Sequence, residues 1–382
     1  MIPYGRQFID DDDIAAVVAV LKSDFLTQGP TIPRFEQAMA SFVGARHAVA
    51  VANATAALHI GALALGLQPG DRLWTSPNTF VASANAGLYC GATVDFVDID
   101  PRTYNMSVEV LTMKLLAAEK NGTLPKIIVP VDFSGQSCEM EEIYALARQY
   151  GIRVMEDASH AVGGEYLDAR IGGCKHADIT VFSFHPVKIM TTGEGGMLLT
   201  NDDDLHQALL RLRSHGITRD PALRANASQA PWGYDQVDLG FNYRITDLQA
   251  ALGESQLRKL PAFVSRRREL AARYDEQLVG LPLTLPWQHP DTRSSWHLYV
   301  VKTRAEHRLA VYHGLRAAGI LTQIHYIPVH TQPFYQRLGF RPQDFPVAKA
   351  YYDETLSLPL FYSMTDEEQA CVVQVLSDSL KT

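Results

Sequence analysis

The sequence predicts an α/β protein with a mostly parallel central sheet, followed by a smaller C-terminal α+β domain. Up to residue 200, short apolar runs alternate with helical segments, which is the order of a parallel sheet covered on both faces. Past Gly280-Leu281-Pro282 the pattern changes to two strands and three helices. The 382 residues suffice for one large domain or two ordinary ones.

The elements of the first part follow from apolar periodicity and turn residues. The expected strands are residues 48–52, 72–76, 94–98, 126–131, 152–155, 179–184 and 197–200. The expected helices are residues 32–43, one starting near 53–59, one ending near 90, and residues 140–150, 202–214 and 246–279, the last interrupted at Pro261. Residues 221–238 are expected to form a loop.

The C-terminal part is expected to contain strands 296–302 and 320–324 and helices 304–318, 345–356 and 365–380. We place the domain boundary after residue 250. Residues 1–250 would form the large domain, including the N-terminal segment, and residues 251–382 the small one.

Composition narrows the class of protein. The net charge is −8, from 34 basic and 42 acidic residues, which argues against a nucleic-acid binder. We expect no signal peptide and no membrane span, because no apolar run is long enough. The scattered Cys90, Cys138, Cys174 and Cys371 lack metal-ligand spacing, so we expect reduced thiols, no metal site and a cytoplasmic location.

Three chemically distinctive residues follow strands. Phe80, Asp157 and Lys188 each come just after an apolar run, and ligands of such sheets bind beyond the carboxyl ends of the strands. Desolvation would lower the pKa of Lys188 and give a neutral amine that can form a Schiff base. Asp157 needs a partner at that depth, and a protonated pyridine nitrogen would supply one. A structural ion pair of Asp157 with a basic side chain is the alternative.

A phosphate cradle can be placed beside these residues. Asn53 to His59 reads as a strand, a turn and a helix start, and the free N–H groups of a helix start attract anions. An ordinary capped helix is the alternative. With hydroxyls from Thr55 and Ser183, a ring cover from Phe80 and a ring contact from His160, the set suits pyridoxal phosphate.

Four motifs resemble one family closely. They are Glu-Asp-Ala-Ser-His-Ala at 156–161, Ser-Phe-His-Pro-Val-Lys at 183–188, Thr-Gly-Glu-Gly-Gly-Met at 192–197 and Gly-Phe-Asn-Tyr-Arg-Ile-Thr-Asp-Leu-Gln-Ala-Ala-Leu-Gly at 240–253. The chain resembles the DegT/DnrJ/EryC1/StrS family of pyridoxal-phosphate-dependent enzymes acting on nucleotide-linked keto sugars. This resemblance implies fold type I of these transferases, similar to aspartate aminotransferase.

The resemblance also implies roles for matching residues. Lys188 would form the Schiff base, Asp157 would pair with the pyridine nitrogen, and His160 would contact the ring oxygen. The remaining implied cofactor contacts are Thr55, Ala56, Phe80, Ser183 and, from the second subunit of a homodimer with shared active sites, Asn242. The implied substrate contacts are Tyr4, Thr27, Gly29, His215, Arg244, His325, Tyr326 and His330. Asn53 departs from the family, in which we expect a serine or similar small residue.

Further segments resemble one branch of the family. They are residues 2–7, 24–30, 76–85, 214–221 and 325–333. This branch aminates C4 of UDP-2-acetamido-2,6-dideoxy-β-L-arabino-hex-4-ulose, with L-glutamate as donor and 2-oxoglutarate as by-product, in pseudaminic acid synthesis.

Three other functions are weighed against this one. An aminotransferase for another UDP- or dTDP-linked 4-ketosugar, or for an aminocyclitol, would use the same chemistry. A sugar dehydratase on the same fold would carry histidine at the position of Lys188. A binding or regulatory protein would not need Asp157, His160 and Lys188 together.

Overall fold

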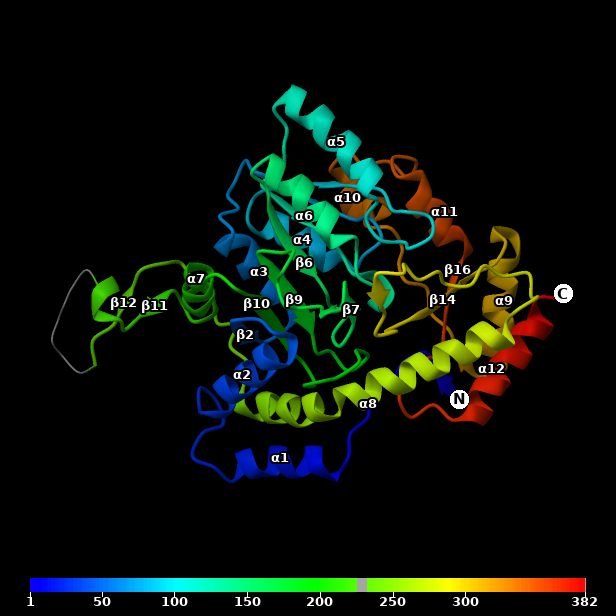
Figure 1. Ribbon diagram of the computed structural model, residues 1–382, viewed down its shortest axis with the longest axis horizontal. Coiled ribbons are helices and arrows are strands. Elements are labelled where there is room, and N and C mark those ends of the chain that lie inside the picture. The colour runs from blue at the N-terminus through cyan, green and yellow to red at the C-terminus, as the bar shows by residue number, and fades with distance from the viewer. Residues whose placement is uncertain (225–231, 382) are drawn as a thin grey trace.

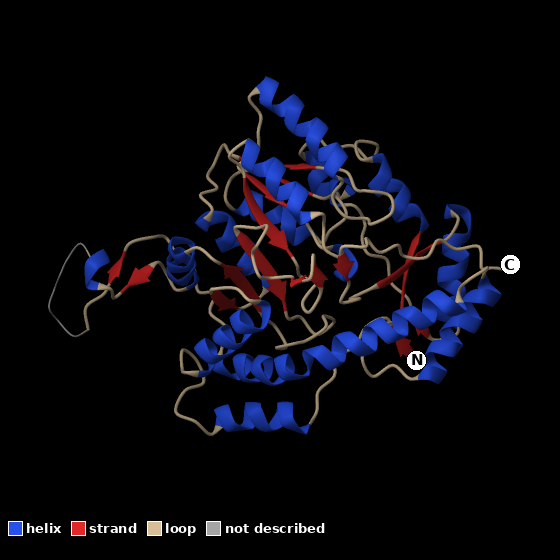
Figure 2. Ribbon diagram, in the orientation of Figure 1, coloured by secondary structure: helices blue, strands red, loops and turns tan. Residues whose placement is uncertain are grey.

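The structure, a computed structural model, describes residues 1–224 and 232–381. Its centre is a seven-stranded sheet in the order β2-β10-β9-β6-β5-β3-β4 (Figure 2). The strands are β2 (His47–Val51), β3 (Arg72–Thr75), β4 (Thr93–Phe96), β5 (Ile127–Val129), β6 (Arg153–Asp157), β9 (Ile179–Ser183) and β10 (Gly196–Thr200). Only β10 runs antiparallel to its neighbours in this sheet, which confirms the predicted mostly parallel arrangement.

Helices cover both faces of this sheet, as Figure 1 shows. They are α2 (Thr31–Val43), α3 (Ala54–Ala64), α4 (Val81–Tyr89), α5 (Val108–Asn121), α6 (Met140–Gln149), α7 (Asp203–Arg213) and α8 (Asp247–Gln277). Ala48 and Ala50 of β2 share one apolar cluster with α2, α5, α6 and α8, while Val49 and Val51 share the other with α3, α4 and α7. Alternate residues of a strand point to opposite faces, so both faces need apolar residues.

Helix α8 is continuous from Asp247 to Gln277, so the expected interruption at Pro261 is wrong. Proline inside a helix costs about 3 kcal/mol through a lost hydrogen bond and a clash. The same stretch buries Leu257, Leu260 and Phe263. Burying a large apolar side chain contributes about 1.5–3 kcal/mol, so the packing outweighs the proline. The helix also crosses position 250, where we propose the domain boundary.

The C-terminal region has its own apolar cluster, to which the end of α8 contributes Leu270 and Tyr274. Its elements are β14 (Tyr299–Lys302), α9 (Ala305–Ala317), β15 (Ile320–Leu321), α10 (Pro333–Arg337), α11 (Pro346–Glu354), β16 (Thr355–Leu358) and α12 (Asp366–Ser379). The N-terminal strand β1 (Ile2–Pro3) pairs with β15, and Ile2 belongs to this cluster. The first residues of the chain are therefore anchored in the C-terminal region.

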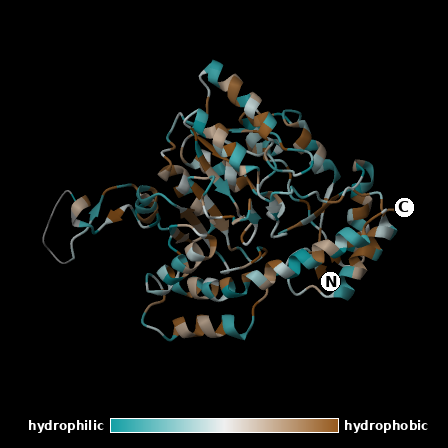
Figure 3. Ribbon diagram, in the orientation of Figure 1, coloured by the Kyte–Doolittle hydropathy of each residue, from teal (hydrophilic) through white to brown (hydrophobic). Residues whose placement is uncertain are grey.

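Helix α1 (Asp11–Leu21) was not expected from the sequence. Asp10 and Asp13 form a reciprocal capping box at its start, and the helix packs along α8. Its Ile14, Val18 and Leu21 are exposed, and α1 is largely pale to brown in Figure 3. The helix therefore leaves apolar side chains on an outer face.

The remaining elements are short. They are β7 (Glu165–Tyr166), β8 (Ala169–Arg170), β11 (Ile217–Thr218), β12 (Asp235–Gln236), β13 (Thr292–Arg293) and the 3₁₀ turns Phe133–Gly135, Pro221–Leu223 and Val329–Thr331. Strands β11 and β12 form an arm that projects from the body (Figure 1). Residues 225–231 of the predicted loop lie outside the described residues. Within the described ranges, no helix has the length and apolar content needed to cross a membrane.

Candidate active site

The carboxyl end of β6 holds Asp157, whose residue is only 5% exposed. The Ser83 hydroxyl donates a hydrogen bond to Oδ2 at 2.6 Å, and the backbone N–H of Ser159 donates one to Oδ1 at 3.1 Å. These two donors fix the orientation of the carboxylate. No cationic side chain within the described ranges forms an ion pair with it, so the structural ion pair considered above is not present.

Lys188 follows the next strand, β9, in a turn closed by its own N–H and the His185 carbonyl at 2.8 Å. Its side chain is partly exposed, but the protein around its amine is dense. Desolvation lowers the pKa of Lys188 from 10.5 to about 8, and the nearby charge of Asp157 opposes this shift. About one amine in ten is then neutral at pH 7, which is the nucleophilic form.

His160 is buried beside these two residues. Its Nδ1 accepts a hydrogen bond from the Ser134 backbone N–H at 3.3 Å, so Nε2 carries the proton and donates to the Tyr326 hydroxyl at 3.0 Å. Burial, followed by the charge of Lys188, holds the pKa of His160 well below its usual range. The imidazole is therefore a neutral, oriented group.

Several predicted substrate residues meet at the same place. Tyr326 bonds His160, and the ring of His325 lies 5.3 Å from that of Tyr4. Burial and then the charge of Lys188 lower the pKa of His325 to about 3, while its Nδ1 contacts the Ser357 hydroxyl at 2.8 Å. These side chains form a wall that β1 and the segment after β15 supply.

Phe80 lies beside this wall. It caps the start of α4, is 58% exposed, and its ring lies 6.3 Å from that of Tyr326. An aromatic ring so exposed has room to stack on a flat ligand.

The start of α3 has the properties of an anion cradle. Asn53 caps the helix by accepting from the Ala56 N–H at 2.8 Å, so the residue that departs from the family pattern has a structural role. The hydroxyls of Thr55 and Ser183 have no hydrogen-bond partner among the described residues. A Cβ on Gly196 would lie 2.6 Å from the Asn53 carbonyl carbon, so only glycine lets β10 approach this turn. Because Gly196 pairs with Ser183, both hydroxyls adjoin one helix start.

The other predicted residues lie elsewhere. Thr27 bridges Thr246, Asn242 bridges Ser214, and the Arg244 guanidinium donates to the Ser214 hydroxyl at 3.0 Å. Gly29 and His215 lie in the same region. The Gly29 N–H donates a hydrogen bond to the buried Asp247 carboxylate at 2.8 Å. His215 and Asn242 are exposed. No hydrogen bond or ion pair of the described residues joins this group to Lys188 or His160.

His330 is fully buried and does not reach the wall of Tyr4 and Tyr326. Its ring packs 4.8 Å from that of Phe345, and Nε2 donates to the Pro342 carbonyl at 3.3 Å. Its surroundings are those of a core histidine.

Three groups of the site were missed by sequence reasoning: Ser83, the Ser134 N–H and His297. The buried His297 ring lies 4.5 Å from that of His160, and its Nδ1 has no partner among the described residues. Gly135 permits this approach, because a Cβ there would lie 2.9 Å from the His297 nitrogen. No local motif marks these residues, since the contacts join segments far apart in the chain.

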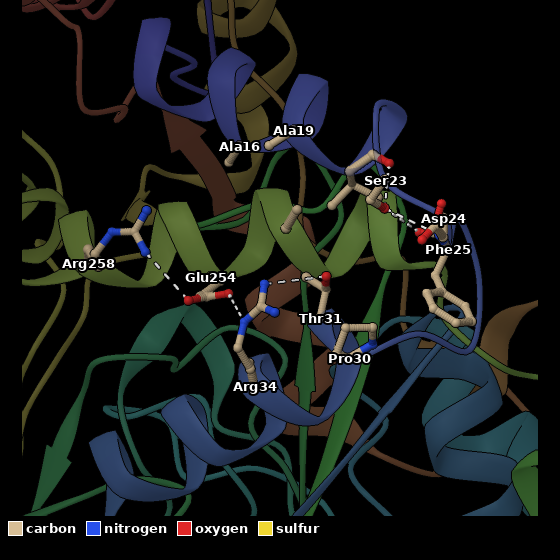
Figure 4. Close-up of a pocket in the computed structure, with 12 residues that line it drawn as sticks. Ala16, Ala19, Ser23, Asp24, Phe25, Pro30, Thr31, Arg34, Glu254 and Arg258 are labelled. Atoms are coloured by element: carbon tan, nitrogen blue, oxygen red, sulfur yellow. Dashed lines mark hydrogen bonds and ion pairs between the residues drawn. The ribbon is translucent and has the colours of Figure 1, made fainter.

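A cavity of about 440 Å³ lies between α1, α2 and α8 (Figure 4). Arg34 bridges Thr31 and Glu254 on its wall, and Arg258 also reaches Glu254. Neither Lys188 nor Asp157 lines it, so it is separate from the site described above. No cluster of histidine, cysteine or acidic residues in the described part of the chain is arranged to hold a metal ion.

Comparison with known proteins gives consistent matches over the whole length. A model of the DegT/DnrJ/EryC1/StrS aminotransferase family matches residues 7–377. The chain is 41% identical over 390 residues to the spore coat polysaccharide biosynthesis protein SpsC of Bacillus subtilis, covering 100% of this chain and 97% of that protein. It is 37% identical over 387 residues to a UDP-4-amino-4,6-dideoxy-N-acetyl-β-L-altrosamine transaminase of Campylobacter jejuni, covering 100% and 98%.

The fold also matches solved structures. The PMP form of the sugar aminotransferase Spr1654 from Streptococcus pneumoniae has a TM-score of 0.91 and 27% identity, covering 100% of this chain and 99% of that one. That protein is also solved in a PLP form. Pyridoxal phosphate is thus the cofactor of this site, and the residues fit it: an anchored carboxylate, an amine of lowered pKa, and two free hydroxyls at a helix start.

The lowered pKa of Lys188 predicts how the cofactor-free protein takes up pyridoxal phosphate. Only the neutral amine attacks the aldehyde, so the rate constant should rise about tenfold per pH unit below pH 8 and level off above it. Stopped-flow absorbance, with borohydride reduction and mass spectrometry to locate the label, measures this rate. Lys188→Ala should lose the site-specific label. A rate that still climbs above pH 9.5 would contradict the lowered pKa.

Proposed function

Because the chain belongs to the DegT/DnrJ/EryC1/StrS aminotransferase family, we propose that it transfers the amino group of L-glutamate to C4 of UDP-2-acetamido-2,6-dideoxy-β-L-arabino-hex-4-ulose. The product would be UDP-4-amino-4,6-dideoxy-N-acetyl-β-L-altrosamine, and the reaction a step of pseudaminic acid biosynthesis. The protein is a pyridoxal-phosphate-dependent sugar aminotransferase. The identity of 37% with the C. jejuni transaminase over the full chain carries the choice of substrate.

We propose that different residues bind the ring nitrogen, the phosphate and the ring face of the cofactor. When bound, pyridoxal phosphate supplies an aldehyde that captures amines and a pyridinium ring that accepts electrons from the adjacent carbon. We assign the pyridine nitrogen to Asp157, whose carboxylate is held in place by hydrogen bonds from Ser83 and Ser159. Thr55 and Ser183 would bind the phosphate at the start of α3, and Phe80 would cover the ring.

Lys188 would move the protons. Its neutral amine can remove the proton from the α-carbon of glutamate, and the resulting ammonium can later protonate C4 of the sugar. A pKa of about 8 suits both directions, because neither protonation state is rare near neutral pH. His160, neutral and held by Ser134 and Tyr326, would orient the ring oxygen without adding a positive charge.

The sugar nucleotide would lie against the wall formed by Tyr4, His325 and Tyr326. A second candidate function is amination of a different UDP- or dTDP-linked 4-ketosugar. It is favoured by the 41% identity with SpsC, whose name gives spore coat polysaccharide biosynthesis and no sugar.

Replacing Asp157 tests the assigned pyridine contact. Asp157→Asn removes the charge opposite the ring nitrogen and should lower kcat by about 10²- to 10³-fold while the cofactor still binds. Steady-state kinetics with a cofactor absorbance measurement separate the two effects. The matched control is Asp95→Asn. Asp95 lies on β4 of the same sheet and forms an ion pair with Lys114, so this variant should keep its activity. Near-normal turnover of Asp157→Asn would remove Asp157 from the mechanism.

The substrate is tested with a panel of UDP- and dTDP-4-ketosugars and glutamate. We expect kcat/KM for the named UDP-sugar to exceed that for each competitor by about tenfold or more, because unpaired polar groups penalise the wrong sugar. NMR of the product should give the altrosamine configuration at C4. Preference for another sugar, or the opposite C4 configuration, would favour the second candidate.

We also propose a homodimer in which a second copy completes each site. Asn242 is exposed, and Trp232 and Leu239 near the β11–β12 arm are 82% and 80% exposed. Single aromatic or leucine side chains so exposed are suited to burial by a partner.

Subunit mixing tests this arrangement. Lys188→Ala and Asn242→Ala proteins should each have little activity, and denaturing and refolding them together should restore up to about a quarter of normal activity. This follows because half of the molecules are then mixed dimers, each with one intact site. Sizing in solution should give twice the chain mass. A monomer, or no recovery on mixing, would contradict shared sites.

A further inference from the structure

Asp132 lies directly beneath the site and has no role so far. It follows β5, is fully buried, and its Oδ1 accepts a hydrogen bond from the Cys138 N–H at 2.8 Å. Its Oδ2 has no donor among the described residues, and its carboxyl group is within side-chain hydrogen-bonding reach of that of Glu156. A buried carboxylate oxygen without a donor is costly, so this contact needs an explanation.

Glu156 is also buried, at 6% exposure, and precedes Asp157 on β6. Its Oε2 accepts from the Thr180 hydroxyl at 2.6 Å. Neither Glu156 nor Asp132 forms an ion pair within the described part of the chain. Two ionised carboxylates in contact, without a cation, repel each other strongly in a buried setting. One proton between them removes the repulsion and gives Asp132 Oδ2 a partner.

We propose that Asp132 and Glu156 share one proton at neutral pH, and that this shared proton limits the negative charge beside Asp157 in the cofactor site. The second half rests on the proposed role of Asp157, whereas the first concerns this chain alone. Burial, then the charge of Glu156, raises the pKa of Asp132 well above its usual range. Burial also raises the pKa of Glu156, although its hydrogen bonds with Thr180 and Asp132 oppose that shift. The proton therefore resides chiefly on Asp132.

The neighbouring groups offer no substitute for this proton. Asp157 is a third acid, linked to the pair by backbone hydrogen bonds: its carbonyl accepts from the Asp132 N–H at 3.1 Å. Burial raises the pKa of the Cys138 and Cys174 thiols, so both stay neutral. A cavity of about 30 Å³ beside Glu156 is also lined by Tyr166, Arg170, Lys175 and His176. None of these side chains forms an ion pair or hydrogen bond with Glu156 within the described ranges.

The consequence for the site is electrostatic. With the shared proton, Asp132, Glu156 and Asp157 carry two negative charges in place of three. A third buried charge at this place would add repulsion that no cation among the described residues offsets. Asp132 is thus a positioning residue that acts through Glu156 on Asp157.

Infrared spectroscopy of the cofactor-free protein at pH 7 tests the proton directly. The wild type should show the band of a protonated carboxyl group. Asp132→Asn and Glu156→Gln should each abolish that band, because each amide supplies the missing donor and leaves one ionised carboxylate. Absence of the band from the wild type, or its persistence in both variants, would overturn the proposal whether or not the proposed function holds.

The pH dependence of unfolding gives a second readout. The native protein holds a proton that the unfolded chain has released above about pH 4, so rising pH favours unfolding of the wild type. Relative to either variant, the unfolding equilibrium constant of the wild type should rise by up to tenfold per pH unit from pH 5.5 until the native proton is lost. A ratio that does not change with pH would overturn the proposal. Because Asp132→Asn and Glu156→Gln are tested separately, the comparison can still be made if one of them does not fold.

Asp178 provides the matched control. It is another buried acid of this region, but Arg148 and Arg153 form ion pairs with its Oδ1 at 2.6 and 2.7 Å. Asp178→Asn should destabilise the protein by a factor that is constant from pH 5.5 to 8 and should keep the infrared band. A band that disappears in this variant as well would mean that it does not report on the Asp132–Glu156 pair, which would overturn the assignment.

Discussion

The candidate site depends on the placement of two ionisable groups, Asp157 and Lys188, at the carboxyl edge of the parallel sheet. Parallel pairing of β6 with β9 aligns Asp157 with Val181, so the acid lies at the edge from which the chain continues to Lys188. Asp157 is buried, and its charge opposes part of the lowering of the Lys188 pKa that desolvation causes. Desolvation lowers the pKa of the Lys188 amine, while the Ser83 hydroxyl and the Ser159 N–H hold the Asp157 carboxylate in one orientation. The same backbone geometry thus yields a reactive amine and a fixed anion.

The histidines around Lys188 follow from that arrangement. Burial lowers the pKa of His160, His297 and His325, and the charge of Lys188 lowers each of them further. Neutral imidazoles can accept and donate hydrogen bonds without competing with Lys188 for Asp157. A site with additional cations there would draw Asp157 away from a pyridinium ring.

Sequence reasoning located what depends on local pattern and missed what depends on packing. The seven strands, Asp157 and Lys188 were predictable, because apolar periodicity marks strands and their ends mark the edge. Ser83 lies inside an ordinary-looking helix, and its bond to Asp157 depends on how α4 sits over the sheet. The interruption expected at Pro261 is wrong because packing outweighs its local cost, whereas His330, predicted as a substrate contact, is buried in the core.

The residues proposed for catalysis and for substrate binding come from different parts of the chain. Asp157 ends β6 and Lys188 follows β9, whereas Tyr4, His325 and Tyr326 lie just after β1 and β15, which pair with each other. The His160–Tyr326 hydrogen bond joins the two parts. On the proposed assignment, changes in the wall that spare this bond would alter the sugar accepted and leave the proton transfer proposed for Lys188 intact. Relatives of similar fold can differ in substrate for this reason, and the residues around Tyr4 and His325 are where such differences would act.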